Sequence, residues 1–338
     1  MPPRTKRRTS IADVARLAEV SVGTVSNVLN RPDRVSPTTR ERVEAAITEL
    51  SFVRNGSARQ LRAGTITTAG AIVLDVANPF FTDVARGIED RLEEAGYTLM
   101  LASSDEDPDR EARYLKLFEE HGVQGVMVVP SGPDIDHLRT LHDRGLRVVL
   151  LDRPSTDPAL SSVAVDDRAG AAAAARHLID LGHEHLAFLN GPHTIRQCAD
   201  RSAGIHDALV EAGLDPATCL EEITITALNA DGGQAGTERV LAMERRPTAT
   251  LCVNDLTALG ALRTLRAAEV PVPSGMAVVG YDDVTFAGEL ATPLTSVRQP
   301  MHALGYRAAD LLLADDETAE QVVFQPELVV RESTTGTG

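Results

Sequence analysis

Carboxylate and amide side chains recur at the ends of apolar runs in this sequence. Asp75, Asp152 and Asn254 each end or follow such a run, and Asp282 ends another. In open sheets of parallel strands, ligands bind beyond the carboxyl ends of the strands. There these groups can hydrogen-bond the hydroxyls of a sugar or nucleoside. Each residue alone fits a strand-end or helix-capping role equally well, but the four together favour a ligand-binding cleft.

Two adjacent aromatic residues, Phe80 and Phe81, follow Asp75 in a chain that has no Trp and only seven Phe. An aromatic face suits the apolar face of a sugar ring. We therefore expect both residues to line the same cleft.

A different polar surface is predicted for residues 10–30, SIADVARLAEVSVGTVSNVLN. Ser10 and Asp13 have the spacing of a capping box. Ser21 can cap a second helix after a tight turn, and Ser36-Pro37 can open a third. The apolar positions face a shared core: Ile11, Val14, Ala15, Ala18, Val25, Val28, Leu29, Val43, Ile47 and Leu50. The pattern predicts a helix-turn-helix whose second helix fits the DNA major groove; the alternative is a helical cap on a larger domain.

The outward face of the second helix would read DNA. Val22 and Asn27 are placed to reach base edges, and an Asn pairs bidentately with adenine. Thr24 and Ser26 are better placed for phosphates, and Gly23 offers no side chain. The candidate DNA contacts of this helix are Ser21, Val22, Gly23, Thr24, Ser26, Asn27 and Asn30.

The charge distribution supports a nucleic-acid partner for the amino-terminal part. Residues 1–64 contain twelve Lys and Arg against six Asp and Glu, whereas the whole chain has a formal net charge of −16. Residues 65–338 therefore carry −22. A basic head neutralises phosphates, and an acidic body of this size is repelled by DNA.

From Thr68 onward, strand-like apolar runs alternate with helical stretches. The runs span 69–76, 97–103, 125–130, 147–152, 163–166, 186–191, 223–228, 249–254 and 277–282. Near-continuous apolar strands separated by helices are typical of parallel sheets covered on both faces. Nine such units are too many for one open sheet of this length, so we predict an α/β fold with two doubly wound sheets.

The residues that carry these patterns closely resemble the lactose-repressor (LacI/GalR) family of bacterial transcription regulators. The resemblance covers DVARLAEVSVGTVSNVLN and VSPTTRERVEAAITELSFVRNGSARQLRAG, and continues through NPFF, LDRP, VDDRAG, VPSGMAVVGYDD, PLTSVRQP and PELVVRES. It implies a three-helix DNA-binding domain (1–54), a hinge (55–65) and a periplasmic-binding-protein-like effector and dimerisation domain (66–338). The latter would have one subdomain of 66–166 and 297–326 and another of 167–296 and 327–338.

The resemblance also implies roles for individual residues. In the family the hinge becomes a helix in the minor groove and wedges one leucine between base pairs. Here that leucine is Leu61, with Ala58 and Arg62 on the same side; the alternative is that Leu61 packs on the body. Effector-contacting positions match Asp152, Arg201, Asn254 and Asp282, cleft positions match Phe80 and Phe81, and Gln299 lies on a crossover segment near the cleft.

Two positions depart from the family pattern. Leu228 stands where many relatives carry an aromatic ring that stacks on the ligand, which leaves the ligand class open. Asn27 stands where Arg or His is usual in the recognition helix, which leaves the operator sequence open.

Two other classes fit less well. A periplasmic sugar-binding protein would need a signal peptide and would lack residues 1–64. An enzyme would need a catalytic motif, and the chain has no GxSxG, HExxH, P-loop or GxGxxG. His183 and His185 are poorly spaced for metal binding, and the three Cys are scattered. We expect no cofactor, no metal and no catalytic residues, and neither a membrane span nor a secretory signal.

The sequence therefore predicts a dimeric, cytoplasmic, ligand-responsive transcription regulator that binds a palindromic DNA operator, with a tetramer as the alternative assembly. In this prediction a sugar inducer releases it from genes for carbohydrate uptake or use. The alternative is a purine or nucleoside effector acting as corepressor.

Overall fold

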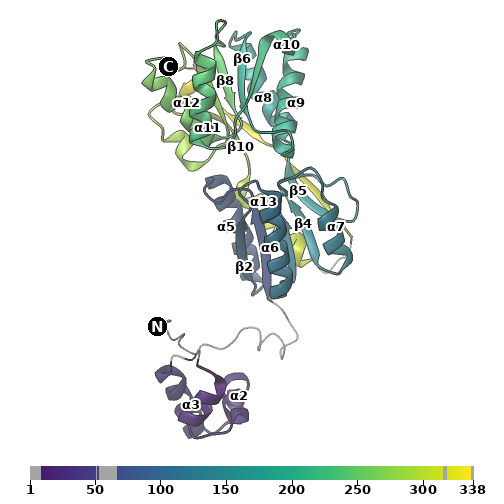
Figure 1. Cartoon of the computed structure of the whole chain (residues 1–338), viewed down its shortest axis with the longest axis vertical. Helices are drawn as coiled ribbons and strands as arrows, with labels where there is room; N and C mark the ends of the chain where they lie inside the picture. Colours follow the sequence, from purple (N-terminus) through teal and green to yellow (C-terminus); the bar gives the residue numbers. More distant parts are fainter. Residues whose placement is uncertain (1–8, 51, 53–66, 315–317, 336–338) are drawn as a thin grey trace, which may run out of the picture. The chain divides into compact units, whose positions relative to one another are not determined.

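The protein is described here from a computed structural model, which covers residues 9–50, 52, 67–314 and 318–335. The chain separates into two compact units, Met1–Ile66 and Thr67–Gly338 (Figure 1). Each unit has its own hydrophobic packing, separate from that of the other.

The amino-terminal unit is built from three helices and one short 3-10 turn. These are α1 (Ile11–Leu17), α2 (Val22–Asn30), η1 (Pro32–Arg34) and α3 (Pro37–Glu49). The capping box is present, because the Asp13 amide donates to Ser10 Oγ at 3.3 Å and the Ser10 amide donates to Asp13 Oδ2 at 2.9 Å. Val14, Val25 and Val43, one from each helix, are fully buried together. The helix-turn-helix prediction is confirmed.

Ser36 and Pro37 open α3 as predicted, with Ser36 as the N-cap residue and Pro37 at the first helical position. The Ser36 side chain makes no capping bond to the backbone of α3; its hydroxyl donates instead to Thr39 Oγ1 at 2.8 Å. α3 begins at Pro37, whose missing N–H has no intrahelical partner to lose at the first helical position.

The second unit contains two six-stranded sheets, the first with the order β2-β1-β3-β4-β5-β11 and every neighbouring pair parallel. Helices α5 and α13 pack on one face, and α6 and α7 on the other (Figure 1). The strands are β1 (Thr68–Val73), β2 (Thr98–Ser103), β3 (Gly125–Val128), β4 (Arg147–Leu151), β5 (Ser161–Val165) and β11 (Gln321–Phe324). The helices are α5 (Pro79–Glu94), α6 (Pro108–His121), α7 (Asp136–Asp143) and α13 (Met301–Leu313).

The second sheet has the order β7-β6-β8-β9-β10-β12, with only the β10–β12 pair antiparallel. The helix pairs α8–α9 and α11–α12 lie on opposite sides of β6 and β8 (Figure 1). The strands are β6 (Leu186–Asn190), β7 (Leu220–Thr224), β8 (Ala249–Cys252), β9 (Ala277–Asp282), β10 (Thr295–Arg298) and β12 (Glu327–Val329). The helices are α8 (Asp167–Asp180), α9 (Arg196–Glu211), α10 (Pro216–Cys219), α11 (Ala230–Leu241), α12 (Asp255–Ala267), η2 (Thr285–Gly288) and α14 (Glu332–Thr335).

The predicted α/β class and the two doubly wound sheets are confirmed, but three strands were not predicted. The missed strands β10, β11 and β12 are only three or four residues long, and β11 and β12 are partly exposed. Short strands of this kind lack the continuous apolar run that marks a buried strand. The strand expected at 223–228 lies instead at 220–224, so residues 225–228 form the loop beyond its carboxyl end.

Three chain segments connect the two sheets, after β5, after β10 and between β11 and β12. Val297 and Arg298 still pair with Tyr281 and Asp282 in the second sheet, so the second crossing comes slightly later than the expected boundary at 297. Because three separate connections join the subdomains, a rotation of one against the other bends all three together.

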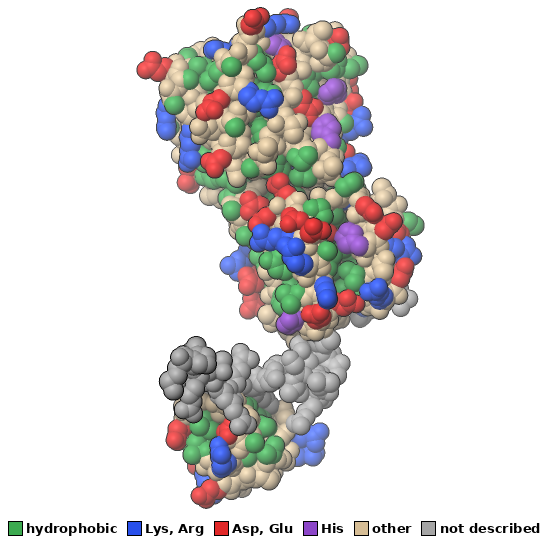
Figure 2. All heavy atoms as spheres, in the orientation of Figure 1, with side chains coloured by type: hydrophobic (Ala, Val, Ile, Leu, Met, Phe, Trp, Pro, Cys, Tyr) green, Lys and Arg blue, Asp and Glu red, His purple; other side chains and the backbone are tan. Residues whose placement is uncertain are grey.

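On the face shown in Figure 2, acidic and basic side chains are interspersed over the surface of the second unit. The described helices include none with the length and apolar character needed to cross a membrane.

Candidate functional site

The exposed face of α2 carries the residues predicted to contact DNA. Ser21 caps the helix by accepting from the Thr24 amide at 3.0 Å. Val22, 44% exposed, is the large apolar side chain that α2 leaves open to solvent, and Asn27 is exposed as well. Asn30 donates to the Ser26 carbonyl at 2.8 Å and is held against its own helix. The helix therefore presents one apolar and one amide side chain to a partner.

Gly23 on the same face has no packing reason to be glycine. A Cβ added there would meet only Ser21 Oγ, at 3.6 Å, which is an ordinary contact. Glycine inside a helix costs about 1 kcal/mol relative to alanine. An uncompensated cost of this kind fits a position where another molecule approaches the backbone closely.

The hinge residues Ala58, Leu61 and Arg62 lie outside the described residues, and their predicted roles stay predictions.

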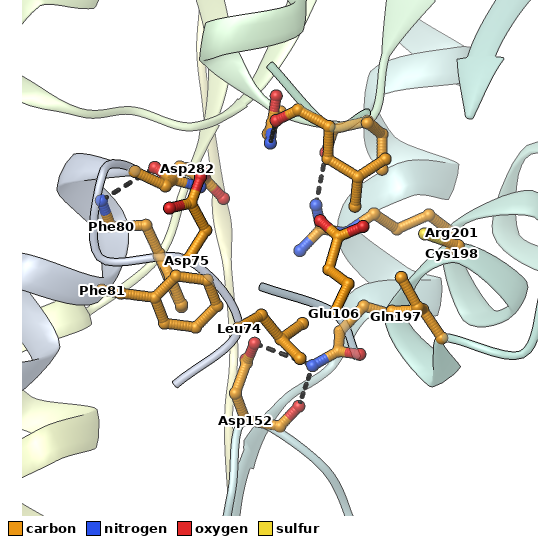
Figure 3. A pocket seen from close by; sticks show the side chains of 15 residues that line it. Leu74, Asp75, Phe80, Phe81, Glu106, Asp152, Gln197, Cys198, Arg201 and Asp282 are labelled. Carbon is orange, nitrogen blue, oxygen red and sulfur yellow. Dashed lines mark hydrogen bonds between the residues drawn. The ribbon is translucent and has the colours of Figure 1, made fainter. Parts of the chain in front are cut away.

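A pocket lies between the two sheets of the second unit, beyond the carboxyl ends of β1, β4, β8 and β9. Its free volume is about 50 Å³, far below the roughly 300–1,000 Å³ of typical ligand sites, so a ligand must widen it. Figure 3 shows its labelled side chains converging from different elements. Lining residues are Leu74, Asp75, Asn78, Phe80, Phe81, Glu106, Asp152, Ile195, Gln197, Cys198, Arg201, Leu228, Val253, Asn254 and Asp282.

Eight of the nine residues predicted to contact the effector line this pocket; the exception is Gln299. Gln299 is buried beside it and donates from Nε2 to Asp282 Oδ1 at 2.8 Å. It therefore orients Asp282 without lining the cavity.

Arg201 is the cation among the lining residues, and it is already engaged by the protein. Its Nε donates to Asp167 Oδ1 at 2.8 Å, its Nη1 donates to the Val253 carbonyl, and its guanidinium stacks 3.6 Å from the centre of the Tyr281 ring. Burial alone would lower the pKa of Arg201, but the Asp167 carboxylate and neighbouring groups outweigh burial and hold the pKa above its ordinary value.

The position of Arg201 depends on the close packing of α9 on α8. A Cβ at Gly204 would lie 2.1 Å from the Arg168 carbonyl oxygen, so only glycine allows this approach. Asp167 stands in the first turn of α8, and the contact between the helices brings it to Arg201.

Asp152 joins the two subdomains. Gln197 on α9 donates from Nε2 to the Asp152 carbonyl at 2.6 Å and to Asp152 Oδ2 at 2.9 Å (Figure 3). Oδ1 of the same carboxyl is buried and has no hydrogen-bond partner among the described residues. Burial raises the pKa of Asp152 well above its ordinary value, and the nearby Asp167 charge adds to this.

Asp282 faces the pocket at the end of β9. Besides Gln299, its partner is Asn78 of the other subdomain, whose Nδ2 lies 3.5 Å from Asp282 Oδ2. Burial raises the pKa of Asp282 to about 7, although Arg201 acts in the opposite direction.

Three pocket carboxylates stand on backbone that side chains rarely adopt. The φ angles are 61° at Glu106, 54° at Asp152 and 107° at Asp282. Residues other than glycine held at positive φ cost of order 1–3 kcal/mol and concentrate at functional sites. The fold therefore maintains these three acids in position at a cost to stability.

The other predicted residues have partly structural roles. Asn254 caps α12 by accepting from the Thr257 amide at 2.8 Å, and it donates to the Leu228 carbonyl at 2.8 Å. Asp75 accepts from the Ala77 amide at 2.8 Å. Phe80 and Phe81 contact each other edge to face, with centroids 4.9 Å apart, and form an apolar wall.

Four important residues were missed from the sequence: Asn78, Glu106, Asp167 and Gln197. Gln197 lies one helical turn before Arg201, and Glu106 and Asp167 follow strand-like runs, so the rule used for Asp75 could have found them. Among the described residues no group of His, Cys, Asp and Glu is arranged to hold a metal ion.

A helix-turn-helix unit and a two-subdomain unit with a pocket between its sheets, present in one chain, define a ligand-responsive DNA-binding regulator. Residues 10–55 match the family described as "Bacterial regulatory proteins, lacI family", and residues 67–331 match "Periplasmic binding proteins and sugar binding domain of LacI family". The chain belongs to the LacI family, and the resemblance seen in the sequence is confirmed.

Similar proteins support the same assignment. The HTH-type transcriptional repressor PurR of Photobacterium profundum is 34% identical over 330 residues, which are 96% of this chain and 98% of that protein. A solved CelR–cellobiose complex is 31% identical with a TM-score of 0.71, covering 96% of this chain and 100% of that one. The lac repressor dimer bound to operator and the anti-inducer ONPF is 27% identical with a TM-score of 0.77, covering 97% and 99%.

Proposed function

We propose that this protein is a transcriptional repressor that binds a palindromic operator as a homodimer and responds to a purine or nucleoside bound in the pocket. The observation that carries the proposal is the pocket itself: acids and amides of both subdomains converge on it in a member of a DNA-binding family. A repressor of bacterial genes works in the cytoplasm, where the chromosome lies. The tetramer stays the alternative assembly.

The operator is read, in this proposal, by α2 and the hinge. Val22 and Asn27 contact base edges, and Ser21, Gly23, Thr24, Ser26 and Asn30 contact or approach the DNA backbone. Ala58, Leu61 and Arg62 enter the minor groove. Inserting a side chain between base pairs in the minor groove costs free energy, and the added contact area of the bent DNA offsets this cost.

A purine is the first candidate for the ligand, ahead of the sugar that the sequence by itself predicts. The curated relatives at 32–34% identity carry the name PurR, which favours the purine alternative. The pocket chemistry supports this order. Phe80, Phe81 and Leu228 offer apolar surface to the faces of a flat base, and the carboxylates of Asp152 and Asp282 can accept from N–H groups on its edge.

A sugar is the second candidate, and one observation favours it. The similar solved structure of CelR is a cellobiose complex, and carboxylates accept from hydroxyls as readily as from ring N–H groups. Arg201, held in place by Asp167, and Asp282 would then bind neighbouring hydroxyls.

The mechanism we propose is a shift between two arrangements of the subdomains. The Gln197–Asp152 and Asn78–Asp282 contacts already connect the subdomains across the pocket. A ligand that also contacts both sides changes the relative stability of the two arrangements, and a corepressor favours the one in which paired hinges fold on DNA. By linkage, DNA then strengthens ligand binding by the same factor.

The test begins with an operator selected from random DNA by the full-length protein. Fluorescence anisotropy then measures its affinity alone and with hypoxanthine, guanine, adenosine, ribose or cellobiose. A purine corepressor is expected to strengthen operator binding. Weakening by a sugar would favour the second candidate, and the absence of any selected DNA sequence would refute the regulator function.

A further inference from the structure

We infer that the pocket accepts only ligands without negative charge, and that it rejects the phosphorylated form of a compound whose unphosphorylated form it binds. The inference rests on the proposed ligand-binding function and narrows its chemical class. The expected ligand is a free base, a nucleoside or an unphosphorylated sugar that presents N–H or O–H donors.

Acids outnumber bases around the cavity. Glu106, Asp152 and Asp282 line it from different strand ends, with Asp75 beside Glu106. Among the described lining residues the only cation is Arg201, and its charge is already balanced by Asp167 at 2.8 Å. An incoming anion therefore finds no uncompensated positive charge in this wall.

One carboxyl oxygen of Asp152 is an unsatisfied acceptor. Asp152 is 4% exposed, and its Oδ1 has no hydrogen-bond partner among the described residues although Asp152 lines the cavity. A buried acceptor without a partner is costly. A donor on the ligand removes this cost, whereas a phosphate oxygen facing it adds a second acceptor.

Neighbouring side chains hold two of these acids in place. Gln197 binds Asp152, and Asn78 and Gln299 bind Asp282. The backbone of both aspartates and of Glu106 stands at positive φ.

The experiment uses full-length protein and matched pairs of compounds: adenosine and its 5′-monophosphate, ribose and its 5-phosphate, glucose and its 6-phosphate. Isothermal calorimetry measures each affinity at pH 8 and moderate salt. For the pair that binds, repulsion between closely spaced like charges is expected to make the phosphorylated member at least about 100-fold weaker.

A charge variant separates repulsion from steric exclusion. Glu106→Gln removes one negative charge without changing the size of the side chain. It should reduce the ratio of the affinities of the unphosphorylated and phosphorylated compounds about tenfold. Glu120→Gln also removes one negative charge, but on the exposed surface of α6 and away from the pocket, so it should leave this affinity ratio unchanged.

Two outcomes would overturn the inference. One is a phosphorylated member that binds as tightly as its partner or more tightly. The other is a panel in which no member binds, because the pocket would then hold none of the proposed classes. Retained binding of the selected operator in the same preparation would leave the repressor function standing in either case.

Discussion

Replacing Asp282 by Asn should stabilise the ligand-free protein at alkaline pH while impairing its response to ligand. The pKa of Asp282 is raised from 3.8 to about 7 because the folded protein buries this carboxyl. A raised folded-state pKa means that its contribution to stability is full below pH 4 and is lost as the pH rises through 7. The amide of the Asp282→Asn variant never acquires the charge, so the variant escapes that loss.

The size of the expected gain in stability follows from the raised pKa of Asp282. A difference of about three pKa units corresponds to roughly 4 kcal/mol at pH 8. Against this, the new amide group would meet the Asn78 Nδ2 donor, now 3.5 Å from Asp282 Oδ2, which costs about 1 kcal/mol. Because Asp152, Asp167 and Asp255 interact electrostatically with Asp282 and titrate with it, we expect a net gain of roughly 2–3 kcal/mol.

Thermal unfolding of the full chain, followed by circular dichroism at pH 5.5 and pH 8, measures the effect. At pH 8 the variant is expected to unfold roughly 5 °C above the wild type, and at pH 5.5, where the buried carboxyl has caused only part of its loss of stability, the difference should be clearly smaller. Asp207→Asn is the control: Asp207 is exposed, and its hydrogen bond with Arg168 lowers its pKa, so it should show no gain at pH 8. A gain of equal size at both pH values, or a loss at pH 8, would refute the reasoning.

Four further predictions concern the pocket and the DNA-binding surface. Arg201→Ala leaves buried Asp167 without its partner and should lower the free energy of unfolding by about 3 kcal/mol or more; thermal melting and ligand titration would both change, whereas loss of ligand binding alone would contradict this. Gly23→Ala should stabilise the amino-terminal unit by about 0.5–1 kcal/mol yet weaken operator binding, and unchanged DNA affinity would exclude close approach at this residue. Asn27→Ala should abolish a preference for adenine worth about 1–3 kcal/mol in DNA sites selected by the protein. If the preference survives, another residue recognises the adenine. Leu61→Ala should weaken operator binding by roughly 2 kcal/mol or more and leave binding to random DNA nearly unchanged, and equal losses on both would argue against a wedge.

The structure changes the role expected for Arg201. Its match to a family position implies that Arg201 contacts the effector. In the fold, two of its donors and the face of the guanidinium are engaged by Asp167, Val253 and Tyr281. Arg201 therefore supports the pocket wall as well as lining it, and a variant at this position tests both roles at once.

The sequence by itself determined the elements whose signals are local. Helix capping acts over three residues, as between Ser10 and Asp13, and a buried strand is marked by its own apolar run. The rule that ligands bind beyond strand ends then selected Asp75, Asp152, Asn254 and Asp282 correctly as residues that line one pocket.

Only the tertiary structure decided which of these side chains remain available for a ligand. The contact between Asn78 and Asp282 joins residues 204 positions apart, and the bond from Gln197 to Asp152 spans 45. Such pairings depend on strand order and helix packing, which no local pattern encodes. The same holds for the positive φ angles that hold Glu106, Asp152 and Asp282, since surrounding contacts alone impose a backbone that the residues themselves disfavour.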